Sequence, residues 1–197
     1  MSDSHPPAPL LEAIDAVAGW LQGTHIPGVL IGGIAASLLG RPRVTRDVDV
    51  LVLVAESEWQ DFLTAGQAYG FEPRRTNAIE FARTARVLLM RHEPSGIDVD
   101  IVFGALRFEE ETIQRSVWVD IGDVRAPLPS PEDLIIMKAV AHRSRDLIDI
   151  ASILEAHPEV DTTRIRRWVR EFADTLAAPE LYDELERLLT APKGKKK

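Results

Sequence analysis

The chain carries Gly32–Ser37, with the sequence Gly-Gly-Ile-Ala-Ala-Ser, shortly before Thr45–Val50, with the sequence Thr-Arg-Asp-Val-Asp-Val. The first segment places a turn without side chains upstream of two carboxylates. If residues 48–54 form a strand, Asp47 and Asp49 project from the same face of it. Two hard oxygen ligands on one rigid face, beside a glycine turn that lets phosphate approach backbone N–H groups, suit Mg²⁺-dependent nucleotide chemistry.

A third carboxylate is expected on a neighbouring strand, and residues 97–103 supply two candidates, Asp98 and Asp100. These two share one face of the strand, while Ile97, Val99, Ile101 and Phe103 point to the opposite face. Carboxylates along a strand that otherwise packs into a core are costly without a cation or a partner. We favour Asp100 because core residues flank it and it lies deeper in the strand, and Asp98 remains the alternative.

The composition is that of an ordinary globular protein. The 197 residues, 45% apolar and 27% charged, are enough for one sizeable core. The sequence has no apolar run long enough to span a bilayer and no signal-peptide pattern. Because cysteine is absent, disulfides and thiolate metal sites are excluded. We therefore expect a soluble, cytoplasmic protein with no membrane partner.

The charge is distributed unevenly. A net charge of -8 argues against broad, non-specific binding of nucleic acid. Three arginines, Arg41, Arg43 and Arg46, nevertheless lie close to the first carboxylate pair, and a further cluster lies at residues 164–170. A basic surface beside an acidic metal site is compatible with a polyanionic substrate. A solvated helix face remains the alternative explanation for the cluster at 164–170.

Apolar spacing predicts an α/β (α+β) fold with a small mixed β-sheet core and a helical C-terminal half. The expected helices lie at 10–21, at 33–40 and from 59 to near 70, and the expected strands at 29–31, 48–54, 80–90, 97–103, 117–121 and 124–126. From residue 131 onward the pattern is helical, with Ser130 as the N-cap and Pro131 in the first turn. We expect residues 1–127 to form the core, residues 128–192 to form a helical part of the same compact unit, and residues 193–197 to be a disordered tail.

In this order of elements the sequence resembles the polymerase-β-like nucleotidyltransferase superfamily. That pattern has a glycine pair after a strand, then a helix, then Asp-x-Asp on the next strand and a third acidic residue on a later strand. Here it reads Gly32-Gly33, Asp47-Val48-Asp49 and Val99-Asp100-Ile101. The resemblance implies that the core is a nucleotidyltransferase core.

A closer resemblance covers roughly residues 25–156. The segment Pro129–Lys138, followed by Arg143–Ile150, is similar to the AbiEii-type toxin nucleotidyltransferases, which include the mycobacterial MenT toxins. The resemblance implies that Lys138 and Asp146 complete the active site, with Asp149 as the less favoured aspartate. It also implies that Thr45 occupies the hydroxyl position of that group, which is described as acting on the 3′ end of tRNA.

Several residues of the proposed site have a structural alternative. Lys138 lies in an apolar helix, so its stem must cross that face before the ammonium reaches phosphate or solvent. Asp146 and Asp149 could pair instead with Arg143 and Arg145. The hydroxyl of Ser37 could donate to a triphosphate oxygen or belong to a small residue that only packs.

The expected mechanism is two-metal nucleotidyl transfer. Asp47 and Asp49 would bridge two Mg²⁺ ions, and Asp100 would hold the second ion. Lys138 would neutralise charge on the leaving pyrophosphate. The residues expected to contact the nucleotide are Gly32, Gly33, Ser37, Thr45, Arg46 and Lys138.

The leading hypothesis is a Mg²⁺-dependent nucleotidyltransferase that uses an NTP and acts on RNA, at the 3′ end of tRNA, as the toxin of a toxin–antitoxin pair. The cognate antitoxin could be kinase-like, because phosphorylation of Thr45 would add negative charge at the triphosphate site. One alternative is transfer to a small molecule or protein, as in antibiotic-modifying adenylyltransferases, and the acidic net charge favours it. A catalytically silent nucleotide-binding partner is the other alternative, and the three intact aspartates argue against it.

Overall fold

The computed structural model describes residues 7–191 of the chain, and over those residues the chain divides into two compact units. The first unit comprises residues 7–35 and 44–129, and the second comprises residues 36–43 and 130–191. The observed boundary at 129/130 lies close to the expected one at 127/128, but residues 36–43 group with the C-terminal helices. That the two parts form one compact body stays a prediction, and the tail expected at 193–197 lies outside the described residues.

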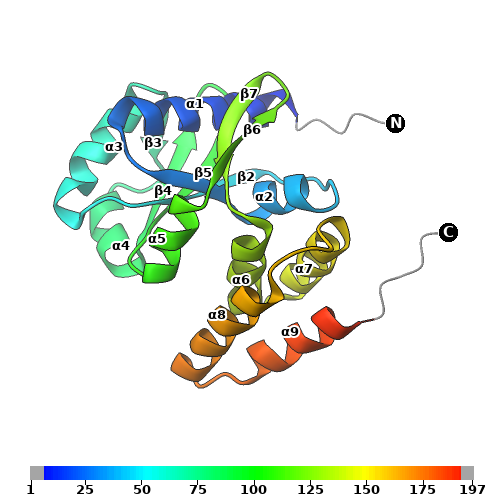
Figure 1. Cartoon of the computed structure of the whole chain (residues 1–197). Coiled ribbons are helices and arrows are strands. Elements are labelled where there is room, and N and C mark those ends of the chain that lie inside the picture. The colour runs from blue at the N-terminus through cyan, green and yellow to red at the C-terminus, as the bar shows by residue number, and fades with distance from the viewer. Residues whose placement is uncertain (1–6, 192–197) are drawn as a thin grey trace. The chain divides into compact units, whose positions relative to one another are not determined.

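Five strands form a mixed sheet in the first unit (Figure 1). They are β1 (Gly28–Ile31), β2 (Asp47–Val52), β3 (Phe71–Pro73), β4 (Val87–His92) and β5 (Ile97–Phe103). Their order in space is β1-β2-β5-β4-β3, with β2 and β5 parallel and the other neighbouring pairs antiparallel. This sheet, with helices packed on it, confirms the predicted fold class.

The other elements of the first unit are four helices, a short 3-10 helix and a hairpin among the described residues. They are α1 (Ala8–Thr24), η1 (Glu56–Glu58), α3 (Trp59–Gln67), α4 (Ala78–Ala85), α5 (Arg107–Gln114), β6 (Val117–Ile121) and β7 (Val124–Leu128). Strand β7 packs against α1 and β1. Helix α2 (Gly32–Leu39) follows β1 directly, and its residues from 36 onward are assigned to the second unit.

The prediction of a strand at 80–90 was wrong over its first half. Residues 78–85 form α4, and β4 begins only at Val87. The segment consists mostly of good helix formers, and it buries Ala78 and Ala82, which lie one helical turn apart. Arg86 ends the helix in the left-handed conformation, with φ of 54°. The later strand, β5, lies where it was expected.

One face of the sheet carries the core of the first unit. The residues of β5 that point to this face, Val99, Ile101 and Phe103, are buried. Helices α1 and α3 cover them with stacked aromatic rings: Trp59 lies 4.1 Å from Phe103, and Trp20 lies 4.3 Å from Phe62, between ring centroids. Because side chains alternate along a strand, Asp98 and Asp100 lie on the opposite face.

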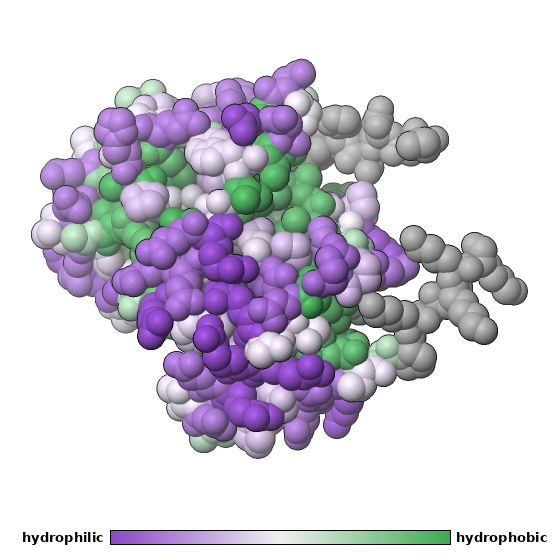
Figure 2. Space-filling view, in the orientation of Figure 1, coloured by the Kyte–Doolittle hydropathy of each residue, from purple (hydrophilic) through white to green (hydrophobic). Residues whose placement is uncertain are grey.

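The second unit contains four helices among its described residues: α6 (Pro131–Ala141), α7 (Ser144–Ala156), α8 (Thr162–Thr175) and α9 (Glu180–Thr190). As predicted, Ser130 caps α6, because its Oγ accepts a hydrogen bond of 3.2 Å from the backbone N–H of Asp133. Helix α8 buries an apolar face and presents a hydrophilic one, which dominates its surface in Figure 2. None of the described helices combines the length and apolar character needed to cross a membrane.

The aromatic layer over the sheet has no room for an additional methyl group at Gly66 in α3. A Cβ atom there would lie 2.6 Å from Cζ2 of Trp20, whose ring is stacked on Phe62 and Phe71. We expect Gly66→Ala to lower the free energy of unfolding by about 1–3 kcal/mol, the cost of overpacking a core. Urea unfolding followed by tryptophan fluorescence measures it.

Gly19→Ala is the matched control, because Gly19 also lies inside a helix, α1. The nearest atom to its added Cβ is Cε1 of Tyr69 at 3.4 Å, an ordinary contact. Alanine should therefore raise the free energy of unfolding by up to about 1 kcal/mol through its better helix propensity. Equal unfolding midpoints for the two variants would contradict this account of the aromatic layer.

Candidate active site

Four carboxylates lie on the two parallel strands at the middle of the sheet. The register of β2 and β5 pairs Asp47 with Asp98 and Asp49 with Asp100. The valines that alternate with the β2 carboxylates, Val48 and Val50, are fully buried, whereas all four carboxylates are partly or fully exposed. The strand register therefore places Asp47 and Asp49 next to a second carboxylate pair. Both residues lie on one face of β2, as the sequence pattern predicted.

The glycine turn touches Asp49. Gly32 follows the last residue of β1 directly and has φ of 65°, a backbone conformation that residues other than glycine rarely adopt. A Cβ atom at Gly32 would lie 1.9 Å from Oδ2 of Asp49, so the position has no space for one. Gly33 follows in the first turn of α2. The turn and the carboxylate pair are thus adjacent within the first unit, as the sequence pattern predicts.

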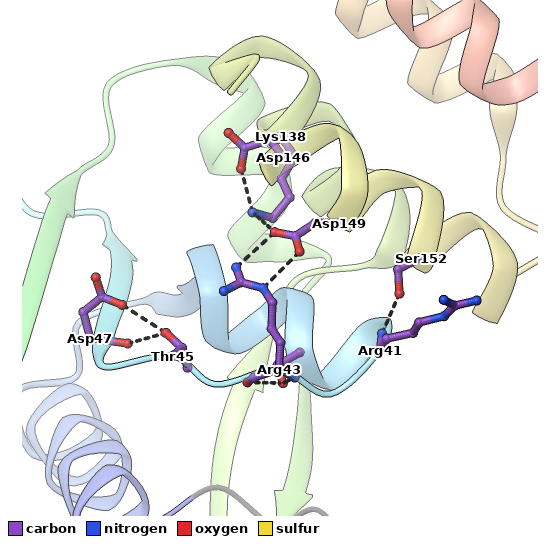
Figure 3. A network of polar contacts seen from close by, with 9 residues as sticks. Arg41, Arg43, Thr45, Asp47, Lys138, Asp146, Asp149 and Ser152 are labelled. Carbon is purple, nitrogen blue, oxygen red and sulfur yellow. Dashed lines mark hydrogen bonds and ion pairs between the residues drawn. The ribbon is translucent and has the colours of Figure 1, made fainter. Parts of the chain in front are cut away.

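Thr45 lies beside the first carboxylate. Its hydroxyl donates a hydrogen bond of 3.0 Å to Oδ1 of Asp47 (Figure 3). The side chain of Arg46, the next residue, is exposed. A hydroxyl that contacts a carboxylate in this way is close enough for any group attached to it to alter the charge around Asp47.

Two arginines that the sequence analysis did not single out hold the second carboxylate pair. Arg74, which follows β3 directly, forms ion pairs with both Asp98 and Asp100. Arg91 of β4 forms an ion pair of 2.9 Å with Asp98. Asp98 therefore has two guanidinium partners and Asp100 has one, which favours Asp100 over Asp98 as the carboxylate available to a cation. The sequence pattern predicted no strand at residues 71–73, so it gave no reason to place Arg74 next to the carboxylates.

The surroundings of Asp100 disfavour its negative charge. Burial raises the pKa of its carboxyl above the usual value, and the neighbouring carboxylates of Asp47 and Asp98 raise it further, while Arg74 acts in the opposite direction. A partly buried carboxylate between two other carboxylates gains from a further positive charge.

The donor set of Asp47, Asp49 and Asp100 fits a hard divalent cation in its chemistry, because all three offer carboxylate oxygens. Asp49 and Asp100 are register partners, and Asp47 is two residues from Asp49 on the same face. Over residues 7–191, no three side chains of the ligand-forming types are already gathered around one point as a metal site. Arg74 binds Oδ1 of Asp100 instead, so its guanidinium would compete with a cation for that oxygen.

Lys138 lies in the second unit, in a buried ion cluster. Its side chain is 7% exposed, and its Nζ lies 2.9 Å from Oδ1 of Asp146 and 2.8 Å from Oδ2 of Asp149 (Figure 3). Arg43 completes the cluster, because Nε and Nη2 bind the two oxygens of Asp149 at 3.0 and 3.1 Å. Two positive and two negative side chains thus balance one another among apolar helices.

The partners of the two aspartates differ from those expected. Asp146 pairs with Lys138 and accepts a hydrogen bond of 3.2 Å from the backbone N–H of Arg143, which caps α7. Asp149 pairs with Arg43, 106 residues away in the sequence, rather than with an arginine of its own helix. Sequence reasoning ranked Asp149 below Asp146, but within this cluster Asp149 makes more ion pairs.

Ser37 also belongs to this second unit. Its hydroxyl accepts a hydrogen bond of 3.0 Å from the backbone N–H of Arg43 and donates one of 3.2 Å to the carbonyl of the same residue. This closes the turn that carries Arg43 toward Asp149. The hydroxyl is used in folding the segment after α2, and its contact with a nucleotide stays a prediction.

Comparison with known proteins agrees with the fold. The model of a family described as "Nucleotidyl transferase of unknown function (DUF2204)" matches residues 10–186. The chain is similar to the crystal structure of an antigenic nucleotidyltransferase-like protein from Paracoccidioides brasiliensis, at 17% identity and a TM-score of 0.54, over 92% of this chain and 94% of that one. It is also similar to the solution structure of the antibiotic-resistance factor ANT(2'')-Ia, at 12% identity and a TM-score of 0.59, over 89% of this chain and 97% of that one. A search of curated proteins found no match.

The buried ion cluster predicts a large loss of stability when its lysine is removed. Lys138→Met keeps the apolar stem but leaves Asp146 with no cationic partner from this cluster and Asp149 with only Arg43. We expect the free energy of unfolding to fall by about 3–5 kcal/mol, the usual cost of breaking a buried ion pair from one side. Chemical denaturation followed by circular dichroism measures it.

Arg41→Gln is the control, because Arg41 also pairs with a residue of α7, Glu155, but at the surface. Its loss should cost less than about 1 kcal/mol, as for other exposed pairs. If Lys138→Met unfolded at the same denaturant concentration as Arg41→Gln, the cluster would contribute little to folding.

Proposed function

The chain belongs to the family of nucleotidyl transferases of unknown function (DUF2204), and from that premise we propose that it transfers NMP from an NTP to an RNA acceptor, the 3′ end of a tRNA. Family membership makes the chain a nucleotidyltransferase, which attaches a nucleotide to an acceptor and releases pyrophosphate. It also supports the predicted superfamily. The narrower resemblance to the AbiEii-type toxins stays a prediction.

The observation that carries the proposal is the strand register that sets Asp49 beside Asp100, with the Gly32 turn against Asp49. Nucleotidyl transfer needs negative ligands for a cation, and a backbone surface without side chains where phosphates can approach. The carboxylates and the glycine turn lie together in one small region of the first unit, which supports the proposal. Thr45 lies at the same place through its hydrogen bond to Asp47.

Nucleotidyltransferases generally use divalent metals, and Asp47, Asp49 and Asp100 would hold the two Mg²⁺ ions of this enzyme. The bound ions would stabilise charge on the phosphates and acidify the acceptor hydroxyl. The backbone N–H groups of Gly32 and Gly33, where α2 begins, would orient the triphosphate. The carboxylate of Asp100 would also accept the proton of the acceptor hydroxyl.

Lys138 would bind a phosphate oxygen through the one N–H of its ammonium group that does not face an aspartate of the ion cluster. An ammonium group has three N–H donors, and two of them face Asp146 and Asp149 in the described structure. The third could bind an oxygen of the leaving pyrophosphate, with Asp146 and Asp149 holding the ammonium in position. Ser37 and Arg46 would add contacts to the nucleotide, as expected from the sequence.

Charge favours RNA over a cationic small molecule as the acceptor. Arg74 and Arg91 lie at the carboxylates, and the exposed Arg46 directly precedes Asp47. Guanidinium groups beside a nucleotidyl-transfer site can bind the phosphates of a polyanion. Transfer to a small molecule remains the second candidate, and the net charge of -8 is what favours it.

The biological role that we propose is that of a toxin, whose modification of tRNA is neutralised by a cognate antitoxin. This step rests on the resemblance of the Lys138 and Asp146 segment to the AbiEii-type group and on Thr45. A kinase-like antitoxin would phosphorylate Thr45, and the added charge would lie beside the carboxylate of Asp47. Cytoplasmic location follows from that role.

Asp49→Asn tests the site. The substitution keeps the size of the side chain against Gly32 but removes the negative charge, so transfer should fall at least about 10²-fold while folding is retained. Purified protein is incubated with each labelled NTP, Mg²⁺ and total tRNA, and in parallel with aminoglycoside and lincosamide acceptors. Label on tRNA supports the RNA proposal, and label on an antibiotic alone contradicts it.

Asp98→Asn is the matched control, because Asp98 has the same chemistry on the adjacent strand but is held by two arginines. It should keep transfer within a few-fold of the wild type. If Asp98→Asn abolished transfer and Asp100→Asn did not, Asp98 would be the third ligand and our assignment would be reversed.

A phosphate on Thr45 should silence the enzyme. Thr45→Glu places a negative charge next to Asp47, where it would compete with the triphosphate for cations, so transfer should be lost. Thr45→Ser keeps the hydroxyl that binds Asp47 and should keep most of the activity. Both variants are compared by the rate of label transfer to tRNA, and wild-type rates for Thr45→Glu would refute a regulatory role for this residue.

A further inference from the structure

A surface cavity of about 490 Å³ opens in the first unit at the edge of the sheet formed by β3. Its walls come from α3, the end of β3, the segment that follows β3 and the first turn of α4. The lining residues are Gln60, Leu63, Pro73, Arg74, Arg75, Thr76, Asn77, Ala78, Ile79 and Glu80. Neither the family match nor the sequence pattern gives this cavity a role.

Arg74 connects the cavity to the carboxylates. It lines the cavity, and its guanidinium also binds Asp98 and Asp100 through Nη1 and Nη2. Its side chain remains 27% exposed although it makes these two ion pairs. A ligand in the cavity that carries a negative charge would therefore compete with the two carboxylates for the same guanidinium group.

The chemistry of the walls suits a nucleotide. Arg75 offers a second guanidinium, which lies 4.5 Å over the ring of Phe81 and donates to Oδ1 of Asn77 at 3.3 Å. The amides of Gln60 and Asn77 can read hydrogen-bonding edges, and Leu63 and Ile79 add apolar surface. Glu80 is the one acidic side chain among the described residues that line the cavity. Flat, polar and anionic ligands match this combination.

The position of the cavity relative to the glycine turn suits the acceptor rather than the donor. In the strand order β1-β2-β5-β4-β3, the Gly32 turn follows β1 on one side of the carboxylate strands, and Arg74 follows β3 on the other side. Phosphoryl-type transfer places the attacking oxygen and the leaving oxygen roughly in line, on opposite sides of the phosphorus. If the glycine turn orients the leaving pyrophosphate, the acceptor approaches from the side of Arg74.

We propose that this cavity binds the terminal nucleotide of the RNA acceptor, and that Arg74 moves from Asp98 and Asp100 to a phosphate of that nucleotide. The inference rests on the proposed function for its acceptor class and adds the place where the acceptor lies. It also gives Arg74 a positioning role: binding of the acceptor would withdraw the guanidinium that covers Asp100. Acceptor binding and exposure of Asp100 to a cation would then be coupled.

Binding of a short, fluorescein-labelled, single-stranded RNA without a triphosphate tests the cavity by fluorescence anisotropy over a range of salt concentrations. Arg75, the second guanidinium of the cavity, would contact a further phosphate of the RNA, so we expect Arg75→Gln to weaken binding roughly tenfold, the scale of one charge-assisted hydrogen bond. The slope of log affinity against log salt concentration should also fall by about 0.7, as for one lost phosphate contact to a single strand. Thr76→Trp fills the cavity without changing charge and should weaken binding with an unchanged salt slope.

Arg83→Gln is the charge-matched control, because Arg83 lies on α4 and pairs with Glu56 but does not line the cavity. It should bind the labelled RNA like the wild type. In the wild type, the Nε–H resonance of Arg74, assigned by its disappearance in Arg74→Gln, should shift when the RNA is added. A resonance that does not move would overturn the proposed movement of Arg74.

Two further readouts separate this inference from the proposed function. A fluorescent NTP analogue is titrated into the same variants, and label transfer to tRNA is measured for the wild type. If Arg75→Gln and Thr76→Trp weaken NTP binding but not RNA binding, the cavity holds the donor and the inference is wrong. If the wild type labels tRNA while both variants bind RNA normally, the inference fails and the function stands. If the variants lose RNA binding but the wild type labels no RNA, the cavity stands as an RNA site and the proposed reaction fails.

Discussion

The parallel pairing of β2 with β5 is the constraint on which the candidate site depends. These strands alternate buried apolar residues with carboxylates, and their register sets Asp47 beside Asp98 and Asp49 beside Asp100. Four negative side chains on one face of a sheet repel one another, and a partly buried carboxylate such as Asp100 is costly to ionise. Arg74 and Arg91 offset part of that repulsion. The same arrangement that is unfavourable for folding alone is favourable for holding cations.

Local patterns predicted the parts of this molecule that depend on neighbouring residues. The i, i+2 spacing of the aspartates predicted the faces of β5 and of the first half of β2, the Gly32-Gly33 pair predicted the turn, and Ser130 with Pro131 predicted the start of α6. Local patterns failed at residues 78–85, where a short apolar pattern fits either a strand or a helix and tertiary packing decided for the helix. Local patterns also predicted neither the ion pairs of Arg74 with the carboxylates nor the pairing of Arg43 with Asp149. Contacts between residues so far apart in the sequence follow from the fold and leave no periodic signal.

The buried ion cluster of the second unit adds a structural role for Lys138 that the sequence analysis did not foresee. A lone lysine on an apolar helix suggested either a side chain reaching for solvent or one reaching for phosphate, yet its ammonium lies between Asp146 and Asp149. Such a cluster contributes little net stability compared with apolar packing, but it permits only one arrangement of its members. We interpret it as a cluster that fixes the position of the lysine and of the segment carrying Arg43.

The second unit is discontinuous in sequence, since residues 36–43 come from the middle of the chain that forms the first unit. The polypeptide consequently passes from one unit to the other three times. A fragment that starts at Ser130 would contain Asp149 but not its partner Arg43. A fragment that ends at Pro129 would contain residues 36–43 without their hydrogen-bonding partners, such as Ser152, which binds the backbone N–H of Arg41. A cut of the chain at residue 129 therefore separates residues 36–43 from the helices with which they share these contacts.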